Sequence, residues 1–282
     1  MAYGILFLLS ASLLFSTVPI LAKIVYSEGL PPIWLIEFRL FFAFCFFSLL
    51  VKKGKLEEIK SNLKNLSMLA VFGLAANYFF YHQGLEYTTA SSAQVLESLS
   101  PVFVLFIALA LKEEIINSKK SFGIFLTALG SVVIFNSHIH LSRLIFGDIL
   151  EIFAAITWGY FIVQSNRVMR VSTPNASLIF IFGFSALLFL PLALATPLTL
   201  TSKLFSIALM MGFLHTFIAY LLYFEGIKRT NPTSAAVTFA LSPILTVILE
   251  TKILGEISTP LFYLGISLAI IGIIIVIRQR KK

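Results

Sequence analysis

The chain has 282 residues, of which 59% are hydrophobic and only 12% are charged, and its mean hydropathy is +0.97. A water-soluble domain needs a polar shell that this composition does not supply, so we exclude a soluble protein. The formal net charge of +8 does not require nucleic-acid binding, because the basic residues follow a membrane-topology rule.

Apolar runs of similar length follow one another along the whole chain. Each is close to the ~20 residues that a helix needs to cross ~30 Å of hydrocarbon. Within lipid the backbone groups of a segment must pair internally, and long continuous apolar runs do so as helices rather than as barrel strands. We therefore predict an all-α membrane protein with ten transmembrane helices, at roughly 4–26, 32–51, 66–85, 91–111, 121–138, 147–166, 176–196, 204–226, 233–253 and 259–277.

The first apolar run begins directly after Met1 and Ala2 with no basic region before it, so we expect it to be retained rather than cleaved as a signal peptide. Cys45 is the single cysteine and lies in the second run, which excludes a disulfide within one chain. His138 and His140 fall in a loop without further ligands nearby. We therefore predict no metal site and no cofactor.

The basic residues predict the orientation in the membrane. With the N-terminus inside, 16 of the 21 Lys and Arg residues fall at cytoplasmic loops and ends, so the positive-inside rule places both termini in the cytoplasm. The Lys, Ile and Phe bias fits a prokaryote, and we expect a multi-pass protein of the prokaryotic inner membrane, with the lipid bilayer as its main partner. The cytoplasmic set is Lys52, Lys53, Lys55, Lys60, Lys64, Lys112, Lys119, Lys120, Arg167, Arg170, Lys228, Arg229, Arg278, Arg280, Lys281 and Lys282.

An internal repeat relates the two halves of the chain at an offset of 142 residues, and it predicts two five-helix units at 1–140 and 141–282. Because five is odd, the second unit enters the membrane from the opposite side, so the repeats are inverted. Inverted halves can exchange conformations, which favours a secondary transporter with alternating access over a plain membrane scaffold. The identities include Tyr78/Tyr220, Tyr81/Tyr223, Gly84/Gly226, Thr88/Thr230, Ser92/Ser234, Leu99/Leu241, Ser100/Ser242, Pro101/Pro243 and Glu114/Glu256.

The paired signature from Gly84 to Pro101 and from Gly226 to Pro243, with a Gly-x6-Gly helix closing each half, resembles the drug/metabolite transporter superfamily and its EamA family of ten-span proteins. The resemblance covers the whole chain. It implies that each half is one EamA unit and that the protein exports or exchanges small metabolites or drugs. It also implies a central cavity lined by spans 1, 3, 4, 6, 8 and 9, but it does not select a substrate.

Glu97 is the most informative single residue, because a carboxylate at the centre of a span costs ~2.5 to 3.5 kcal/mol on insertion scales and so marks a cavity or a partner. We expect it to bind a cationic group, a coupling proton, or both in competition. Arg39 in the second span either forms an ion pair with Glu97 or binds a substrate carboxylate. Glu97 corresponds to Phe239 in the second repeat, so the predicted site is asymmetric.

Polar and aromatic side chains near these charges complete the predicted substrate site. Tyr78 and Tyr81 share one helix face, as do their counterparts Tyr220 and Tyr223. The remaining candidates are Asn77, His82, Gln94, Trp158 and His215. The histidines are better explained as hydrogen-bonded structural groups than as proton carriers, and the tyrosines are equally well explained as interfacial or packing residues.

Pro101 and Pro243 each remove a hydrogen bond to the carbonyl four residues earlier, so both helices should kink there and serve as hinges. Gly123 and Gly130, and Gly265 and Gly272, form small-residue seams for close helix contact. The seams serve either within the monomer or in a homodimer, and the sequence leaves both open.

An intramembrane enzyme is the alternative from another class, but the chain contains no H-E-x-x-H or G-x-S-x-G motif, so we predict that it is not an enzyme. No G-x-x-x-x-G-K-[ST] motif occurs either, so uphill transport must use an ion gradient. We predict an exporter of small amphipathic metabolites, with amino acids the leading class because an aromatic cavity with one acid and one base suits a zwitterion. An organic-cation, drug or sugar transporter of the same fold and a non-transporting scaffold remain alternatives.

Overall fold

The structure is a computed structural model that describes residues 2–50, 56–112, 117–136, 145–239, 241–254 and 260–278, and helices account for nearly all of them, with no strand among them. Several residues considered above lie outside these ranges, namely His138, His140, Lys52, Lys53, Lys55, Arg280, Lys281, Lys282, Glu114 and Glu256.

The helices follow the apolar runs closely, and several runs contain two or three consecutive helical segments. In chain order they are α1 (Ala2–Ser27), α2 (Pro32–Leu50), α3 (Leu56–Ser61), α4 (Leu63–Met68), η1 (Leu69–Ala75), α5 (Ala76–Tyr87), α6 (Ala90–Glu97), α7 (Ser100–Ala110), α8 (Ser118–Asn136), α9 (Ile145–Val168), α10 (Pro174–Ala195), α11 (Ser202–Met210), η2 (Met211–Ile218), α12 (Ala219–Ile227), α13 (Pro232–Phe239), α14 (Ser242–Leu254) and α15 (Pro260–Arg278).

Eight of the ten predicted spans are helical stretches long and apolar enough to cross a membrane within the described ranges. The predicted spans at 121–138 and 259–277 correspond to α8 and α15, which are not among the eight. The first turn of α8 contains Lys119 and Lys120, and α15 has a shorter apolar stretch, Tyr263–Val276. Over the residues that it describes, the structure therefore shows an all-helical protein with eight apolar helices of membrane length.

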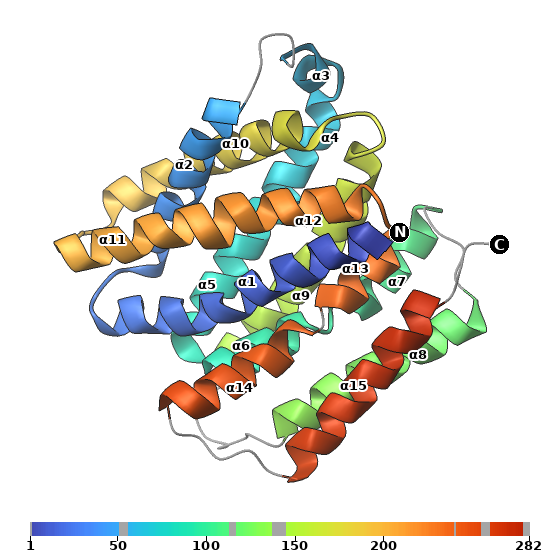
Figure 1. The fold of residues 1–282 in the computed structure, drawn as a ribbon. Coiled ribbons are helices and arrows are strands. Elements are labelled where there is room, and N and C mark those ends of the chain that lie inside the picture. The colour runs from blue at the N-terminus through green and yellow to red at the C-terminus, as the bar shows by residue number, and fades with distance from the viewer. Residues whose placement is uncertain are drawn as a thin grey trace.

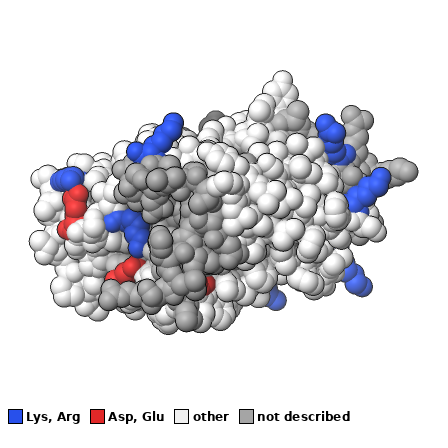
Figure 2. All heavy atoms as spheres, turned by 90° about the horizontal axis from the view of Figure 1, so that it is seen from below, with Lys and Arg blue, Asp and Glu red and all other residues white. Residues whose placement is uncertain are grey.

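The surface of the molecule agrees with a lipid environment. Large apolar side chains are widely exposed, including Leu13, Phe41, Phe106, Leu187 and Leu194, and exposed apolar surface on this scale marks contact with lipid or with other proteins. Figure 2 shows one face on which most of the blue side chains lie toward the two ends of the molecule and much of the surface between them is white or not described.

The bounds of the helices recur at the same offset as the sequence repeat. Residues 90–97 of α6 correspond to 232–239 of α13, and residues 118–136 of α8 correspond to 260–278 of α15. The contacts recur as well, since α5 packs on α9 as α12 packs on α1, and α2 packs on α10 across the two halves. Pairs of elements related by the 142-residue offset therefore pack together in the same way, and Figure 1 shows where each of these helices lies in the bundle.

The contacts also show how α1 and its counterpart α9 run relative to each other. Gly4 at the start of α1 lies against Thr230, and Asn166 near the end of α9 donates to the carbonyl of the same Thr230 at 3.3 Å. The start of one helix and the end of its counterpart thus lie at the same end of the bundle. The two helices are therefore antiparallel.

The two spans that contain Pro101 and Pro243 are interrupted rather than merely kinked. The helix α6 ends at Glu97, Ser98 and Leu99 form a turn, and α7 begins at Ser100 with Pro101 in its first turn. The second copy breaks at the same place, with α13 ending at Phe239 and α14 beginning at Ser242. A proline in the first turn of a helix needs no backbone donor, so a full break satisfies the backbone better than a kinked helix.

Two π-helical segments, η1 and η2, lie 142 residues apart and directly precede the helices that contain the paired tyrosines. Such wide turns are rare and are frequently found at functional sites. The sequence pattern did not indicate them, because a π-turn has no strong residue signature.

The glycine seams face each other within the monomer, where α8 and α15 run side by side along one edge of the bundle (Figure 1). A Cβ atom at Gly130 would lie 2.6 Å from the carbonyl oxygen of Gly265, and one at Gly272 would lie 2.5 Å from that of Gly123. Only glycine permits this approach of the two backbones.

Candidate functional site

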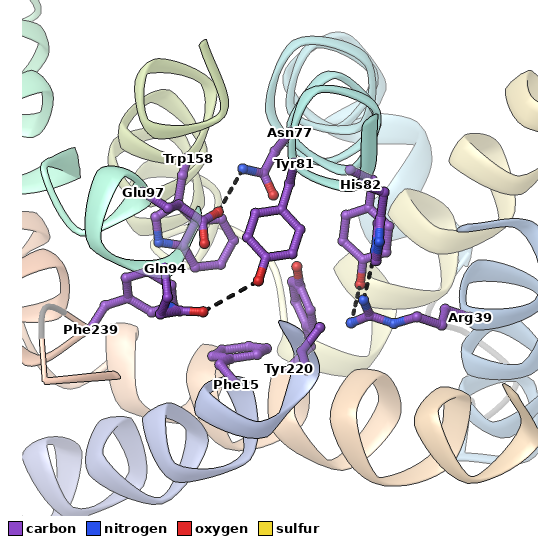
Figure 3. A pocket seen from close by; sticks show the side chains of 12 residues that line it. Phe15, Arg39, Asn77, Tyr81, His82, Gln94, Glu97, Trp158, Tyr220 and Phe239 are labelled. Carbon is purple, nitrogen blue, oxygen red and sulfur yellow. Dashed lines mark hydrogen bonds between the residues drawn. The ribbon is translucent and has the colours of Figure 1, made fainter. Parts of the chain in front are cut away.

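A pocket lies at the centre of the bundle where both helix breaks meet it. Glu97 at the end of α6 and its counterpart Phe239 at the end of α13 both line it, together with side chains from α1, α2, α5, α9 and α12. Figure 3 shows Glu97 and Arg39 on opposite sides of the pocket, with Tyr81 between them. Acid and base thus face a shared space without touching.

Glu97 is held by an amide rather than by a cation. Asn77 of α5 donates through Nδ2 to Glu97 Oε1 at 2.9 Å and to the carbonyl oxygen of Ala154 on α9 at 3.0 Å. The carboxyl is 6% exposed and lies at a helix break. A carboxyl with one amide donor at membrane depth is open to a proton or to a cationic group.

Arg39 is 3% exposed and bonds only to neutral groups among the described residues. Its Nε donates to Thr216 Oγ1 at 3.0 Å and one terminal nitrogen donates to Tyr78 Oη at 3.2 Å. The guanidinium also lies over the ring of Tyr78, 4.8 Å from its centroid. A buried cation without a counter-charge is suited to binding an anionic group from outside the chain.

The bond between Arg39 and His82 determines the tautomer of the histidine. Arg39 Nη1 lies 2.9 Å from His82 Nε2, and because a guanidinium can only donate, that ring nitrogen must accept. The proton of the neutral ring therefore sits on Nδ1, which donates to Tyr26 Oη at 2.5 Å. His82 is thus a neutral positioning group for Arg39 in this conformation.

Aromatic rings form much of the remaining wall. Phe15 packs edge-on against Trp158, Tyr220 and Phe239, with ring centroids 6.0, 5.2 and 5.9 Å apart. Two donors that face this wall have no hydrogen-bond partner among the described residues, Gln94 Nε2 and Trp158 Nε1. Free donors beside aromatic surface suit a ligand with both apolar and polar parts.

The pocket has a volume of about 40 Å³. At ~10 to 15 Å³ of such volume for each water, it holds about three water molecules. A metabolite of amino-acid size therefore enters only when the surrounding helices or side chains move.

Nine of the eleven predicted site residues line this pocket, and two do not. His215 and Tyr223 are buried beside it, and His215 contributes its backbone oxygen to Arg39. The ion pair considered between Arg39 and Glu97 is not formed, because His82 and Asn77 are the respective partners. The nine are Arg39, Asn77, Tyr78, Tyr81, His82, Gln94, Glu97, Trp158 and Tyr220.

Sequence reasoning missed three lining residues, Phe15, Val18 and Phe239. Phe239 had a usable signal, since it is the repeat counterpart of Glu97. Phe15 and Val18 had none, because an apolar residue in an apolar span looks the same whether it faces lipid or a cavity.

Comparisons with known proteins agree across the whole chain. The model of the EamA-like transporter family matches residues 2–136 and again 145–278. A transporter from Clostridium kluyveri is 28% identical over 100% of this chain and 95% of its own length, and one from Archaeoglobus fulgidus is 29% identical over 73% of each chain. A solved crystal structure with 18% identity has a TM-score of 0.74 over 98% of this chain and 96% of the other, which shows the same fold.

Proposed function

The chain belongs to the EamA-like transporter family, and from that premise we propose that this multi-pass membrane transporter moves small zwitterionic metabolites, with amino acids the leading class. Its named relatives are transporters, in keeping with a protein that is not an enzyme. The proposal rests on one observation. Two groups of opposite charge, Arg39 and Glu97, line the same aromatic pocket and do not form an ion pair with each other. Arg39 suits a substrate carboxylate, and Glu97 suits a substrate ammonium or a proton.

The proposed mechanism is alternating access between two inverted halves, 1–140 and 141–282. Its support is the double match of the family model, the antiparallel run of α1 and α9, and the recurrence of helix breaks at 142 residues. We include α8 and α15 as the fifth and tenth spans, since they occupy equivalent places in the two halves. The two breaks lie at the pocket, and the two π-helical segments directly precede α5 and α12, whose side chains line it. A change in helix direction at these places would open the pocket to either side.

The remaining parts of the proposal concern direction, energy and location. Export is the direction that the family resemblance implies. Proton coupling follows if the Glu97 carboxyl binds a proton and the substrate ammonium in turn, because the two cannot occupy one carboxylate together. The positive-inside distribution of Lys and Arg supports the inner membrane of a prokaryote with both termini in the cytoplasm.

The test is solute flux into proteoliposomes that contain the purified protein, with amino acids, organic cations and sugars screened with and without a pH gradient. Arg39→Gln and Glu97→Gln each remove one charge while keeping a polar side chain of similar size. We expect amino-acid flux to fall about 10- to 100-fold in both variants, because losing a buried charged contact costs about 2 kcal/mol or more. Glu225→Gln is the matched control, since Glu225 is a partly exposed carboxylate paired with Arg229.

Each outcome selects among the alternatives. Organic-cation flux that survives Arg39→Gln but not Glu97→Gln overturns the zwitterion and identifies a cation transporter of the same fold. Sugar flux that neither substitution affects would show that neither Arg39 nor Glu97 binds the substrate. If no solute moves while the protein unfolds cooperatively on heating, the proposed substrate class is wrong and a scaffold role gains.

A further inference from the structure

A second buried carboxyl group, outside the pocket, lies on α9. Glu151 is 0% exposed, and both of its carboxyl oxygens are buried without a hydrogen-bond partner among the described residues. An ionised carboxylate in such surroundings costs several kcal/mol, so the group must carry a proton or bind a cation. Glu151 is not among the residues that the sequence analysis singled out.

The described surroundings of Glu151 favour a proton over a coordinated metal ion. The helices α5 and α9 cross so closely that a Cβ atom at Gly84 would lie 2.7 Å from Glu151 Oε1 and 3.0 Å from the carbonyl oxygen of Gly147. Hard cations need six or more oxygen ligands at a site. No cluster of three or more His, Cys, Asp or Glu side chains occurs in the part of the chain that the structure describes.

Glu151 is linked to the pocket through its own helix. Ala154 lies three residues further along α9, and its carbonyl accepts from the same Asn77 amide that holds Glu97. Asp148 lies three residues earlier, near the start of the helix, where it accepts from Thr88 at 2.8 Å. Five ionisable groups interact electrostatically with Glu151. They are Lys23 on α1, Glu97 on α6, Asp148 on α9, and the phenols of Tyr26 and Tyr81.

We propose that Glu151 is a second proton-binding site, which passes protons between the Asp148 end of α9 and Glu97 at the pocket. Each transfer breaks the O–H bond of one carboxylic acid and forms one on the next carboxylate, directly or through water when the helices separate. One group gains the negative charge that the other loses, so charge and protons balance. The coupling role rests on the proposed function, whereas proton binding itself does not.

The primary test is infrared difference spectroscopy of the full-length protein in lipid vesicles, which detects the C=O stretch of protonated carboxyl groups during a pH titration. It needs no substrate, so it remains decisive even if the proposed function fails. We expect Glu151→Gln to remove one carboxylic-acid band that is present in the wild type at neutral pH, and Glu151→Asp to restore a band at a shifted frequency. Glu28→Gln, which changes a carboxylate paired with Lys203, should leave that band intact.

Two results overturn the proposal. One is an unchanged band in Glu151→Gln, which would mean that Glu151 is ionised or that the band belongs to another acid. The other is a band that sodium ions remove at constant pH, which would make Glu151 a metal-cation site. If solute flux is found, Glu151→Gln should also lower pH-gradient-driven accumulation about tenfold or more. Accumulation at the wild-type level would overturn the coupling role alone.

Discussion

At the scale of single residues, the centre of the protein depends on how buried charges are held. Arg39 places four donor contacts on neutral acceptors, and Glu97 receives one amide donor, so neither group forms an ion pair with a described residue. An arrangement of this kind is costly for stability and useful for binding, because a ligand that brings the opposite charges completes it. Substitutions of the residues around Arg39 and Glu97 should therefore affect the stability of the protein and its transport activity differently.

His82 gives the first prediction at this scale. His82→Leu removes the acceptor for Arg39 Nη1 and leaves a buried charged donor without a partner, so we expect a loss of about 1 to 3 kcal/mol of stability. Tyr26→Phe removes only the neutral partner of His82 Nδ1 and should cost less. The measurement is the thermal unfolding midpoint of each purified variant in one detergent. A larger loss in Tyr26→Phe would contradict the tautomer assigned to His82.

At the scale of elements, the two interrupted spans are the parts best placed to change shape. Each break removes helical hydrogen bonds next to the pocket, and each lies after a π-helical segment and its tyrosine-bearing helix in the same half. Breaks at equal positions in both halves allow the two sides to open by similar motions.

Replacing the prolines tests the role of these breaks as hinges. Pro101→Ala and Pro243→Ala restore a backbone donor and let the helical segments join, so we expect transport to slow on the order of tenfold, the effect of about 1.4 kcal/mol on a barrier. Pro191→Ala is the matched control, because Pro191 lies inside α10 at an exposed position. Equal transport rates in all three variants would show that the breaks do not limit the motion.

The seam between α8 and α15 gives a prediction about packing. A side chain at Gly272 would meet Thr127 and the backbone of Gly123 within 2.4 to 2.6 Å, so Gly272→Leu must push the helices apart. We expect a cost of about 1 to 3 kcal/mol, visible as a lower unfolding midpoint in detergent. Ile271→Leu, at a neighbouring exposed position, should have no measurable effect. An unchanged midpoint in Gly272→Leu would mean that this helix pair separates freely.

At the scale of the whole molecule, orientation is the property to test. In a Cys45→Ala background we expect a cysteine at Lys203, whose side chain is 67% exposed, to react with a membrane-impermeant maleimide in intact cells. A cysteine at Arg170 should react only after the membrane is permeabilised, since the positive-inside rule places it in the cytoplasm. The reverse pattern would invert the proposed topology and the direction assigned to transport.

The membrane class, the positions of most helices and the internal repeat could be predicted from the amino-acid sequence alone. These properties are local. Each segment in lipid must form its backbone hydrogen bonds internally, and lipid favours an apolar composition in every span. Glu97 and Arg39 could be identified as candidate site residues for a similar reason. Placing a charged side chain within an apolar span costs free energy, and the sequence position alone shows that the charge lies there.

Which side chains contact one another depends on the tertiary structure. The partners of Arg39 and Glu97 come from other helices, and they depend on the rotation and crossing of those helices, which hydropathy does not encode. The same holds for the apolar wall at Phe15 and for Tyr223, which lies outside the pocket that its counterpart Tyr81 lines. Glu151 is the sharpest case, because its isolation arises where two glycine-bearing helices cross, and that crossing exists only in the folded bundle.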